Sequence, residues 1–281
     1  MEKQRKIVVE LETPDGQLAR FDGLNVKFSV KKTANAVMNK ATIDIANLSL
    51  DRIFDLTTFA SPYLNARKRK RINLYAGYTD SGADDSVPLI FSGEITKAQP
   101  TMPPDIWLNC EARTGFYNNQ RVVSMGVNGK ISVKELCGKV AESIGLSLDF
   151  TSTGNKTVEG FSHNGGATQA LNKVNDLGGV IAFEDDGVLR VMDSARPVTS
   201  EYVRVLNRHS GMIGIPQIDH MGIKVKMLLD PAFRVGDRVQ VESELIPKAN
   251  GVYWCYALSH SGTLRGTDFY TEIEARRMDI L

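Results

Sequence analysis

The sequence lacks a strong excess of either charge and lacks any long hydrophobic run. Its 281 residues contain 34 Lys and Arg against 33 Asp and Glu, so the formal net charge is +1. A chain so balanced has no overall field that would attract nucleic acid or an anionic membrane. No apolar run reaches the length that a membrane-spanning helix needs. We therefore expect no membrane contact and no sequence-specific nucleic-acid binding, and any partner must be recognised locally.

The amino terminus also lacks the apolar core of a secretory signal. The charged start MEKQRK leads directly into the alternating apolar residues Ile7 and Val9, which is not the pattern of an exported protein. We therefore expect a protein that is made in the cytoplasm. Cysteine is scarce, and Cys110, Cys137 and Cys255 lie far apart in apolar stretches. This spacing predicts reduced thiols in the core rather than disulfides or a zinc site.

The residue spacings of common catalytic and metal sites are missing as well. His163, His209, His220 and His260 do not fall at metal-ligand spacing with one another or with a cysteine. No phosphate-binding loop and no nucleophile elbow is present. The acidic triplet at residues 184–186 falls at an expected hairpin turn, where solvation and turn propensity explain it. We therefore expect no enzyme activity, no cofactor and no metal.

Alternation of apolar and polar side chains dominates the chain up to residue 113. In residues 24–31 the apolar side chains fall on one face and the polar side chains on the other, which predicts a half-buried strand. The same pattern recurs in residues 72–78, 89–95 and 106–112. We therefore predict a first β domain over residues 1–118, built as an antiparallel barrel or sandwich.

One short helix is expected to interrupt this domain. Ser49 can cap it, and the apolar residues Leu50, Ile53 and Phe54 follow before Pro62 stops it. In residues 39–49 an extended segment with Ala41, Ile43 and Ile45 on one side leads directly into this helix, with no reactive group nearby. This raises the question of what the helix contacts.

The periodicity becomes helical after residue 118. Ser132 and Glu135 form a capping box before an apolar stripe that ends at Gly145. A second helix with a similar stripe follows and leads into a hairpin that turns at Asp186. These features predict a small α+β insert over residues 119–198.

Alternation returns near the carboxyl end, in strands expected around Val225, Val239, Trp254 and Ile273. They predict a second β domain over residues 199–281. The fold class is therefore α+β, mainly antiparallel β, with two β units flanking the insert.

The most prominent local charge feature is the run formed by Arg67, Lys68, Arg69, Lys70 and Arg71. Successive cations can bind phosphates, but no aromatic residues interleave with these and the rest of the chain is balanced. Surfaces that read bases usually carry stacking residues or a wider basic face. We therefore predict a solvated loop or a contact with an acidic neighbouring subunit.

Three stretches of the sequence resemble the baseplate hub proteins of contractile-tailed bacteriophages and of related phage-derived devices. The first is LNVKFSVKKTANAVMNKATIDIANLSLDRI, with two strands followed by the short helix. The second is GFSHNGGATQALNKVNDLGGVIAFEDDGVLRVM in the insert. The third comprises DPAFRVGDRVQVES and LSHSGTLRGTDFYTEIEA near the carboxyl end. Together they cover most of the chain.

The resemblance implies a structural component of a virion tail, a late protein assembled in the host cytoplasm. It implies two tail-tube-like β-barrel units per chain, so that a homotrimer supplies as many units as a hexameric tube ring. Such a ring would join the tail tube protein to the central spike protein and contact other baseplate proteins. The resemblance also places the short helix outside the barrel and beside a neighbouring subunit, where Leu50, Ile53 and Phe54 are available for the barrel flank or for a subunit interface.

Three alternatives remain open at this point. The insert also resembles small modules of secretins and TonB-dependent receptors, which build rings in the periplasm, although these proteins need an export signal. A tail tube or tube-terminator protein would share the tube-like fold. A cell-wall hydrolase is disfavoured by the missing catalytic residues.

Overall fold

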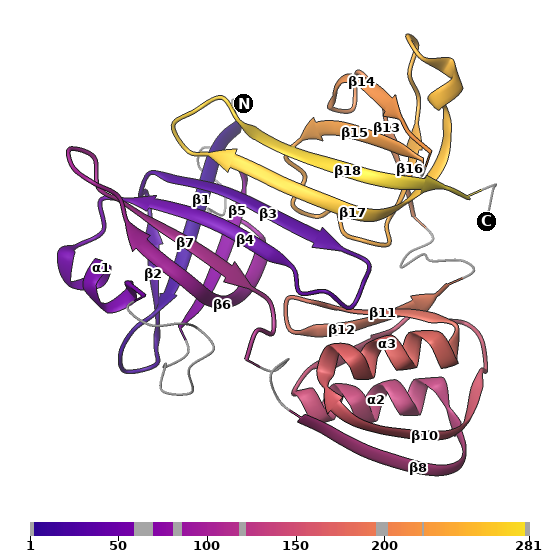
Figure 1. Cartoon of the computed structure of the whole chain (residues 1–281). Coiled ribbons are helices and arrows are strands. Elements are labelled where there is room, and N and C mark those ends of the chain that lie inside the picture. Colours follow the sequence, from indigo (N-terminus) through magenta and orange to yellow (C-terminus); the bar gives the residue numbers. More distant parts are fainter. Residues whose placement is uncertain are drawn as a thin grey trace.

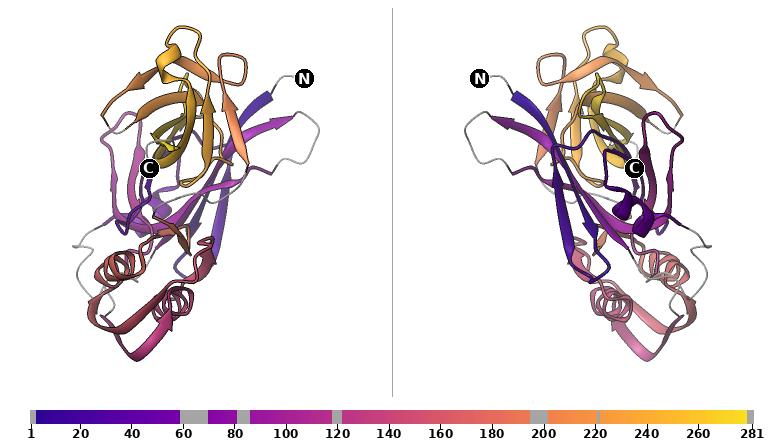
Figure 2. Two further views of the ribbon diagram at one scale, coloured as in Figure 1. Left: turned by 90° about the vertical axis from the view of Figure 1, so that its right-hand side faces the viewer. Right: turned by 90° about the vertical axis from the view of Figure 1, so that its left-hand side faces the viewer.

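A computed structural model of the chain describes residues 3–58, 70–80, 86–117, 122–194, 202–220 and 222–278. Within these residues the fold is mainly antiparallel β with three α-helices, so the predicted mainly antiparallel β class is confirmed, whereas two separate barrels are not observed. Figures 1 and 2 show a large β body with a smaller helical unit at one end. The domain boundaries predicted near residues 118 and 198 fall outside the described residues.

The amino-terminal part of the chain forms the first β region. Its elements are β1 (Lys3–Glu12), β2 (Leu18–Asp22), β3 (Val26–Thr33), β4 (Lys40–Ala46), α1 (Leu50–Leu56), β5 (Arg71–Asp80), β6 (Leu89–Pro100) and β7 (Trp107–Arg113). The alternation noted in the sequence matches the burial along β3, where Val26, Phe28 and Val30 are buried and Lys27 and Lys31 are exposed.

The carboxyl-terminal part forms the second β region. Its elements are β13 (Val203–Leu206), β14 (Met212–Ile218), β15 (Ile223–Leu228), β16 (Arg238–Val241), the 3-10 helix η1 (Pro247–Ala249), β17 (Gly251–Thr263) and β18 (Phe269–Arg277). β17 pairs with β3 in antiparallel register, with His260 opposite Val30. This pairing joins the two β regions edge to edge.

The two regions therefore form one 13-stranded sheet rather than two separate barrels. The hydrogen-bonded order is β14-β15-β18-β17-β3-β4-β7-β6-β5-β1-β2, with β16 branching from β17 and β13 pairing with β16. Among the described residues this order ends at β14 and at β2 and does not close on itself. The branch ends at β13. The terminal strands of an open sheet are the places where another chain can pair with it.

The insert lies between the two β regions in the sequence. Its elements are β8 (Val122–Ser132), α2 (Val133–Ile144), β9 (Ser147–Phe150), β10 (Thr157–Gly166), α3 (Ala167–Gly178), β11 (Val180–Asp185) and β12 (Val188–Asp193). β8 pairs with β10, and the other strands form a sheet of order β11-β12-β9. Figure 1 shows α2 and α3 side by side between these two sheets.

Local sequence signals explain where the insert helices begin and end. The Ser132 side chain accepts a hydrogen bond of 3.1 Å from the Glu135 backbone nitrogen at the start of α2, as the capping motif predicts. Gly145 ends α2 in the left-handed conformation with φ of 75°, which glycine adopts without steric cost. The predicted positions of both helices are thus confirmed.

Three hydrophobic clusters form the interior, one mainly in each part of the chain. Phe269 of β18 belongs to the cluster of the first β region, where its ring meets the Phe28 ring edge-on at 6.3 Å between centroids. The two β regions therefore share packing as well as backbone hydrogen bonds. Cys110, Cys137 and Cys255 are free and buried, which confirms the prediction for the thiols.

Candidate functional site

One face of the large sheet carries polar side chains across the joint between the β regions. Residues opposite one another in antiparallel strands lie on the same face. One row runs through Lys226 on β15, Glu272 on β18, Ser259 on β17, Lys31 on β3 and Lys40 on β4. These side chains are exposed or half-buried. We call this surface the polar face.

A second row extends the polar face further into the first β region. It runs through Ser261, Ser29, Thr42, Glu111 and Lys97. The hydroxyl side chains form one part of this row and the charged side chains of Glu111 and Lys97 the other, so these five positions are all polar.

The opposite face of these strands is apolar and is covered by the rest of the chain. Ile43 and Ile45 of β4 lie on it, and both are buried in the core cluster of the first β region together with Ile53 and Leu56 of α1. α1 therefore packs on the side of the sheet that is opposite the polar face.

The predicted contact residues of α1 lie in two different environments. Ile53 is 8% exposed and belongs to the core of its own chain, whereas Leu50 and Phe54 are each 73% exposed. The Ser49 hydroxyl caps the helix by accepting a hydrogen bond of 3.4 Å from the Arg52 backbone nitrogen. Of the three side chains in the sequence prediction, Leu50 and Phe54 are therefore the ones that another molecule can reach.

The basic run is only partly described. Arg67, Lys68 and Arg69 lie outside the described residues. Lys70 Nζ lies 2.9 Å from both carboxylate oxygens of Asp55 on α1, and Arg71 Nε lies 3.1 Å from Glu12 Oε2. The last two cations of the run thus pair with acids of the same chain, and Lys70 helps to fix the orientation of α1.

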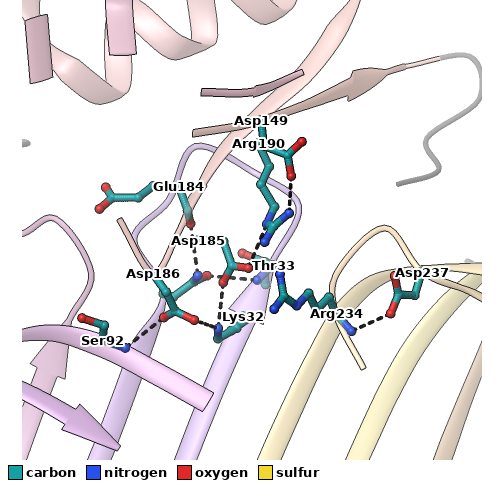
Figure 3. Close-up of polar contacts among 11 residues, drawn as sticks. Lys32, Thr33, Ser92, Asp149, Glu184, Asp185, Asp186, Arg190, Arg234 and Asp237 are labelled. Carbon is teal, nitrogen blue, oxygen red and sulfur yellow. Dashed lines mark hydrogen bonds and ion pairs between the residues drawn. The ribbon is translucent and has the colours of Figure 1, made fainter. Parts of the chain in front are cut away.

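The insert contacts the β body through a buried ionic junction (Figure 3). At the turn between β11 and β12, Asp185 Oδ1 lies 2.7 Å from Lys32 Nζ of β3, and Asp186 forms a second ion pair with the same ammonium. Asp186 Oδ1 also accepts a hydrogen bond of 2.9 Å from the Ser92 backbone nitrogen of β6. We call this set the junction.

The junction is nearly closed to solvent and contains charges of both signs. Lys32 is 7% exposed and Asp185 is 5% exposed. Burial opposes the charged form of Lys32, but the attraction of the two aspartates outweighs it and raises the pKa of Lys32. Burial likewise acts to raise the pKa of Asp185, but Lys32 and Arg190 outweigh it and lower that pKa. Arg190 Nε lies 3.1 Å from Asp185 Oδ2 and provides this carboxylate with a second cation, while the same guanidinium also pairs with Asp149.

The prediction that residues 184–186 form a solvated turn is therefore wrong for Asp185. The turn does have the expected geometry, with positive φ at Asp186 and Gly187, and Gly187 is exposed, but the side chains of Asp185 and Asp186 contact Lys32 of the β body. The sequence did contain a signal for this site, because Lys32 continues the buried face of β3. A lysine at a core position needs a buried acid as its partner.

Two further titratable groups lie near the junction. Burial, and next the neighbouring Glu94, raise the pKa of Glu184 to about 7. His260 is 2% exposed and its Nδ1 lies 2.8 Å from Thr271 Oγ1. Burial lowers the pKa of His260 to about 3, so the ring is neutral at physiological pH.

No group of His, Cys, Asp and Glu side chains within the described residues has the arrangement of a metal site. None of the helices in the described part of the chain is both long enough and apolar enough to cross a bilayer.

Comparison with known proteins gives a consistent result. A family model described as baseplate hub gp41 matches residues 6–275. The 43 kDa tail protein of prophage MuSo2 from Shewanella oneidensis has a similar structure, with a TM-score of 0.67 and 10% identity over 98% of each chain. The tail protein from Neisseria meningitidis MC58 is similar with a TM-score of 0.65 and 11% identity over 96% of each chain.

A third similar structure comes from a secretion system. The E. coli c3393 protein, a component of the type VI secretion system with structural similarity to the T4 bacteriophage tail proteins gp27 and gp5, has a TM-score of 0.56 and 9% identity. The similarity covers 90% of the present chain and 73% of the c3393 chain. No curated protein matches the chain in sequence.

Proposed function

The chain belongs to the baseplate hub gp41 family, and from this premise we propose that three copies form a ring that joins a phage tail tube to the central spike. The protein is a structural component of a phage tail baseplate hub and not an enzyme.

The pairing of β3 with β17 is the observation that carries the proposal. This joint places the two β regions next to each other in one sheet, with a common polar face. One chain thus supplies two adjacent segments of a wall. In a ring of three chains, each chain contributes two wall segments, so the ring has twice as many segments as chains. Such a ring matches a sixfold tube on one side and a threefold spike on the other.

The open edges of the sheet support closure between copies. β14 and β2 end the strand order within the described residues, and exposed edges of this kind favour association with another chain. In the ring, neighbouring copies complete the tube-like barrels that a single chain leaves open. The polar face then lines the channel, and α1 lies on the outer side.

The partners follow from this arrangement. One rim of the ring contacts the tail tube protein and the other contacts the spike, with further baseplate proteins on the outer side. Arg67, Lys68 and Arg69 are proposed to contact an acidic surface of one of these partners. The protein is assembled in the host cytoplasm as a late protein and ends in the virion.

A ring-forming component of a secretion system is the second candidate, and the likeness to the E. coli protein supports it. At 9% identity that likeness shows the fold alone. The two candidates differ in where the protein is found, because a hub co-purifies with DNA-containing tailed particles and a secretion component does not.

Light scattering of the purified protein, alone and with its tail tube partner, tests the stoichiometry. We expect the mass of three chains in at least one of these conditions, because subunits that assemble on a particle can require the partner or a high concentration to associate. A stable complex of six chains would replace the hub proposal with a tail tube or tube-terminator function.

A further inference from the structure

A pocket lies where the three parts of the chain meet. Its volume is about 380 Å³, and its lining comes from residues 88–90 around the start of β6, from the insert hairpin within residues 185–190 and from the loop at residues 231–234 between β15 and β16. Lys32 and His260 also line it. This volume is within the range of sites that bind small organic molecules. We call this space the junction pocket.

The junction pocket has apolar walls and is open to solvent on one side. Pro88, Ile90 and Phe233 contribute apolar side chains to the lining, and Ile90 and Phe233 are only 2% and 1% exposed. Leu89 is 37% exposed and Arg234 is also exposed, so a molecule in solution can enter beside these two residues. The walls favour a ligand with a small apolar body.

The buried ammonium of Lys32 has one hydrogen-bond donor left over. Its Nζ lies 2.7 Å from Asp185 Oδ1 and also pairs with Asp186, which accounts for two of the three protons. Among the described residues no further acceptor bonds to Nζ. Because Lys32 is only 7% exposed and a buried donor without an acceptor is costly, a group inside the pocket is expected to accept this proton.

His260 supplies a second donor. Its Nδ1 lies 2.8 Å from Thr271 Oγ1, and that hydroxyl already accepts a hydrogen bond of 3.0 Å from the Asp230 backbone nitrogen. Thr271 is fully buried, so pairing its hydroxyl proton requires that it donate to Nδ1, which leaves the ring proton on Nε2. In the part of the chain that the structure describes, Nε2 has no hydrogen-bond partner.

Arg234 adds a cation without a counter-ion. Its backbone nitrogen donates a hydrogen bond of 2.9 Å to Asp237 Oδ2, which holds the main chain of the loop. Its guanidinium forms no ion pair and no hydrogen bond with the residues that the structure describes. Figure 3 shows this side chain directed toward Asp185 and Lys32. A guanidinium fits the two oxygens of a carboxylate in a planar, bidentate arrangement.

The charges that line the junction pocket favour an anion. They comprise three cations and two carboxylates, Lys32, Arg190, Arg234, Asp185 and Asp186, a formal excess of one positive charge. Both aspartates already pair with Lys32. Arg190 is shared between Asp185 and Asp149. Arg234 is therefore the cation whose charge a ligand would neutralise.

We propose that the junction pocket binds a small carboxylate, that is, a carboxylate group on an apolar body of a few carbon atoms. The carboxylate lies between Arg234, Lys32 and His260, and the apolar body lies against Ile90 and Phe233. Such a ligand contacts the insert and both β regions at once, so it stabilises their arrangement by binding the folded chain. This site does not depend on the number of chains in the ring.

Matched probes test the site through the thermal stability of the full chain. Butyrate, butyramide and inorganic phosphate are each added at up to about 50 mM and constant ionic strength, and affinities follow from the rise of Tm with probe concentration. Butyramide has the shape of butyrate without its charge, and phosphate has charge without an apolar body. We expect a saturable rise with butyrate and affinities at least about tenfold weaker for the other two.

An absent effect of butyrate, or an equal effect of butyramide, overturns the proposal. An equal effect of phosphate does so as well, because it would indicate an adventitious anion only. The ring of three copies is untouched by any of these results.

A charge variant links the binding to the pocket. We expect Arg234→Gln to weaken butyrate binding by at least about tenfold and to fold normally, because this guanidinium is exposed and has no partner among the described residues. Arg265→Gln is the matched control, since Arg265 is exposed in the turn between β17 and β18. Equal weakening in both variants would show a response to net charge alone and contradict the site.

NMR of the histidine side chains locates the ligand. We expect butyrate to shift the imidazole resonances of His260 and to leave those of His209 and His220 unchanged, because these two are exposed and lie outside the lining. Binding of butyrate without a change at His260 would place the ligand elsewhere and overturn the pocket.

Discussion

Lys32 Nζ lies 2.7 Å from Asp185 Oδ1 although the two residues are 153 positions apart in the sequence. The pair joins β3 of the β body to the hairpin tip of the insert, where Arg190 supports Asp185 from the insert side. Because charged groups that are buried without compensation are costly, this pair fixes how the insert sits on the β body. A hub whose subunits must fit a tube and a spike needs such fixed geometry.

Removing the cation of this pair is expected to destabilise the protein. We expect Lys32→Met to lower the free energy of unfolding by about 3 kcal/mol, the lower end of the range for a buried pair that loses one partner. The lower end applies because Arg190 still compensates Asp185. Denaturant titration measures the change.

The adjacent Lys31→Met variant is its control, because Lys31 is exposed on the polar face and surface changes usually stay within about 0.5 kcal/mol. An equal decrease in the free energy of unfolding in Lys32→Met and Lys31→Met would show that the junction does not stabilise the fold.

Glu184 is expected to make stability depend on pH. Burial and then Glu94, Asp186 and Asp185 raise its pKa from 4.5 to about 7. Between pH 4.5 and about pH 7, Glu184 is protonated in the folded protein but ionised in the unfolded chain. Its contribution to the free energy of unfolding therefore decreases as pH rises through this range and is constant at higher pH.

The Glu184→Gln variant removes this titration. The stability of Glu184→Gln relative to wild type should therefore increase between about pH 5 and about pH 8, as measured by denaturant titration at each pH. A difference between the two proteins that is independent of pH would show that Glu184 titrates normally.

Phe269 should couple the two β regions during unfolding. It is fully buried, and its ring contacts those of Phe28 and Tyr78 at centroid distances of 6.3 and 5.2 Å. We expect Phe269→Ala to cost about 3–5 kcal/mol, as for other buried phenylalanines, and to destabilise strands of both regions in hydrogen-exchange measurements. The exposed Phe54→Ala is the control. Loss of protection in β17 and β18 alone would contradict a shared core.

The insert is expected to behave as a discrete unit over residues 119–198. Both of its helices have buried apolar stripes and left-handed glycine caps at Gly145 and Gly179, and such elements resist cleavage. Limited proteolysis followed by mass spectrometry should therefore find cuts near residues 118 or 198 before any within α2. Early cleavage inside α2 would contradict this domain assignment.

Local features of the fold were predictable from the sequence. Ser132 and Gly145 delimit α2, and Asp186 with Gly187 forms the turn after β11, because each of these depends on residues a few positions apart. β14 was not predicted, since Gly214 and Pro216 interrupt its alternation and its register shifts between Ile213 and Gln217.

Long-range relationships could not be read from the sequence in the same way. The pairing of β3 with β17 and the contact of Lys32 with Asp185 both join distant segments, and period-two alternation does not specify which strands become neighbours. A groove in the second β region is a further case, because its two sides, residues 207–215 and 242–250, meet only in the folded chain.

Electron cryomicroscopy of tailed particles that contain this protein tests the central claim most directly. The account predicts three copies around the tail axis, with both β regions of each copy in one wall and Lys31 and Ser259 of the polar face directed to the channel. Six copies around the axis, each contributing one β region to the wall, would contradict the hub ring and identify the protein as a tail tube or tube-terminator component.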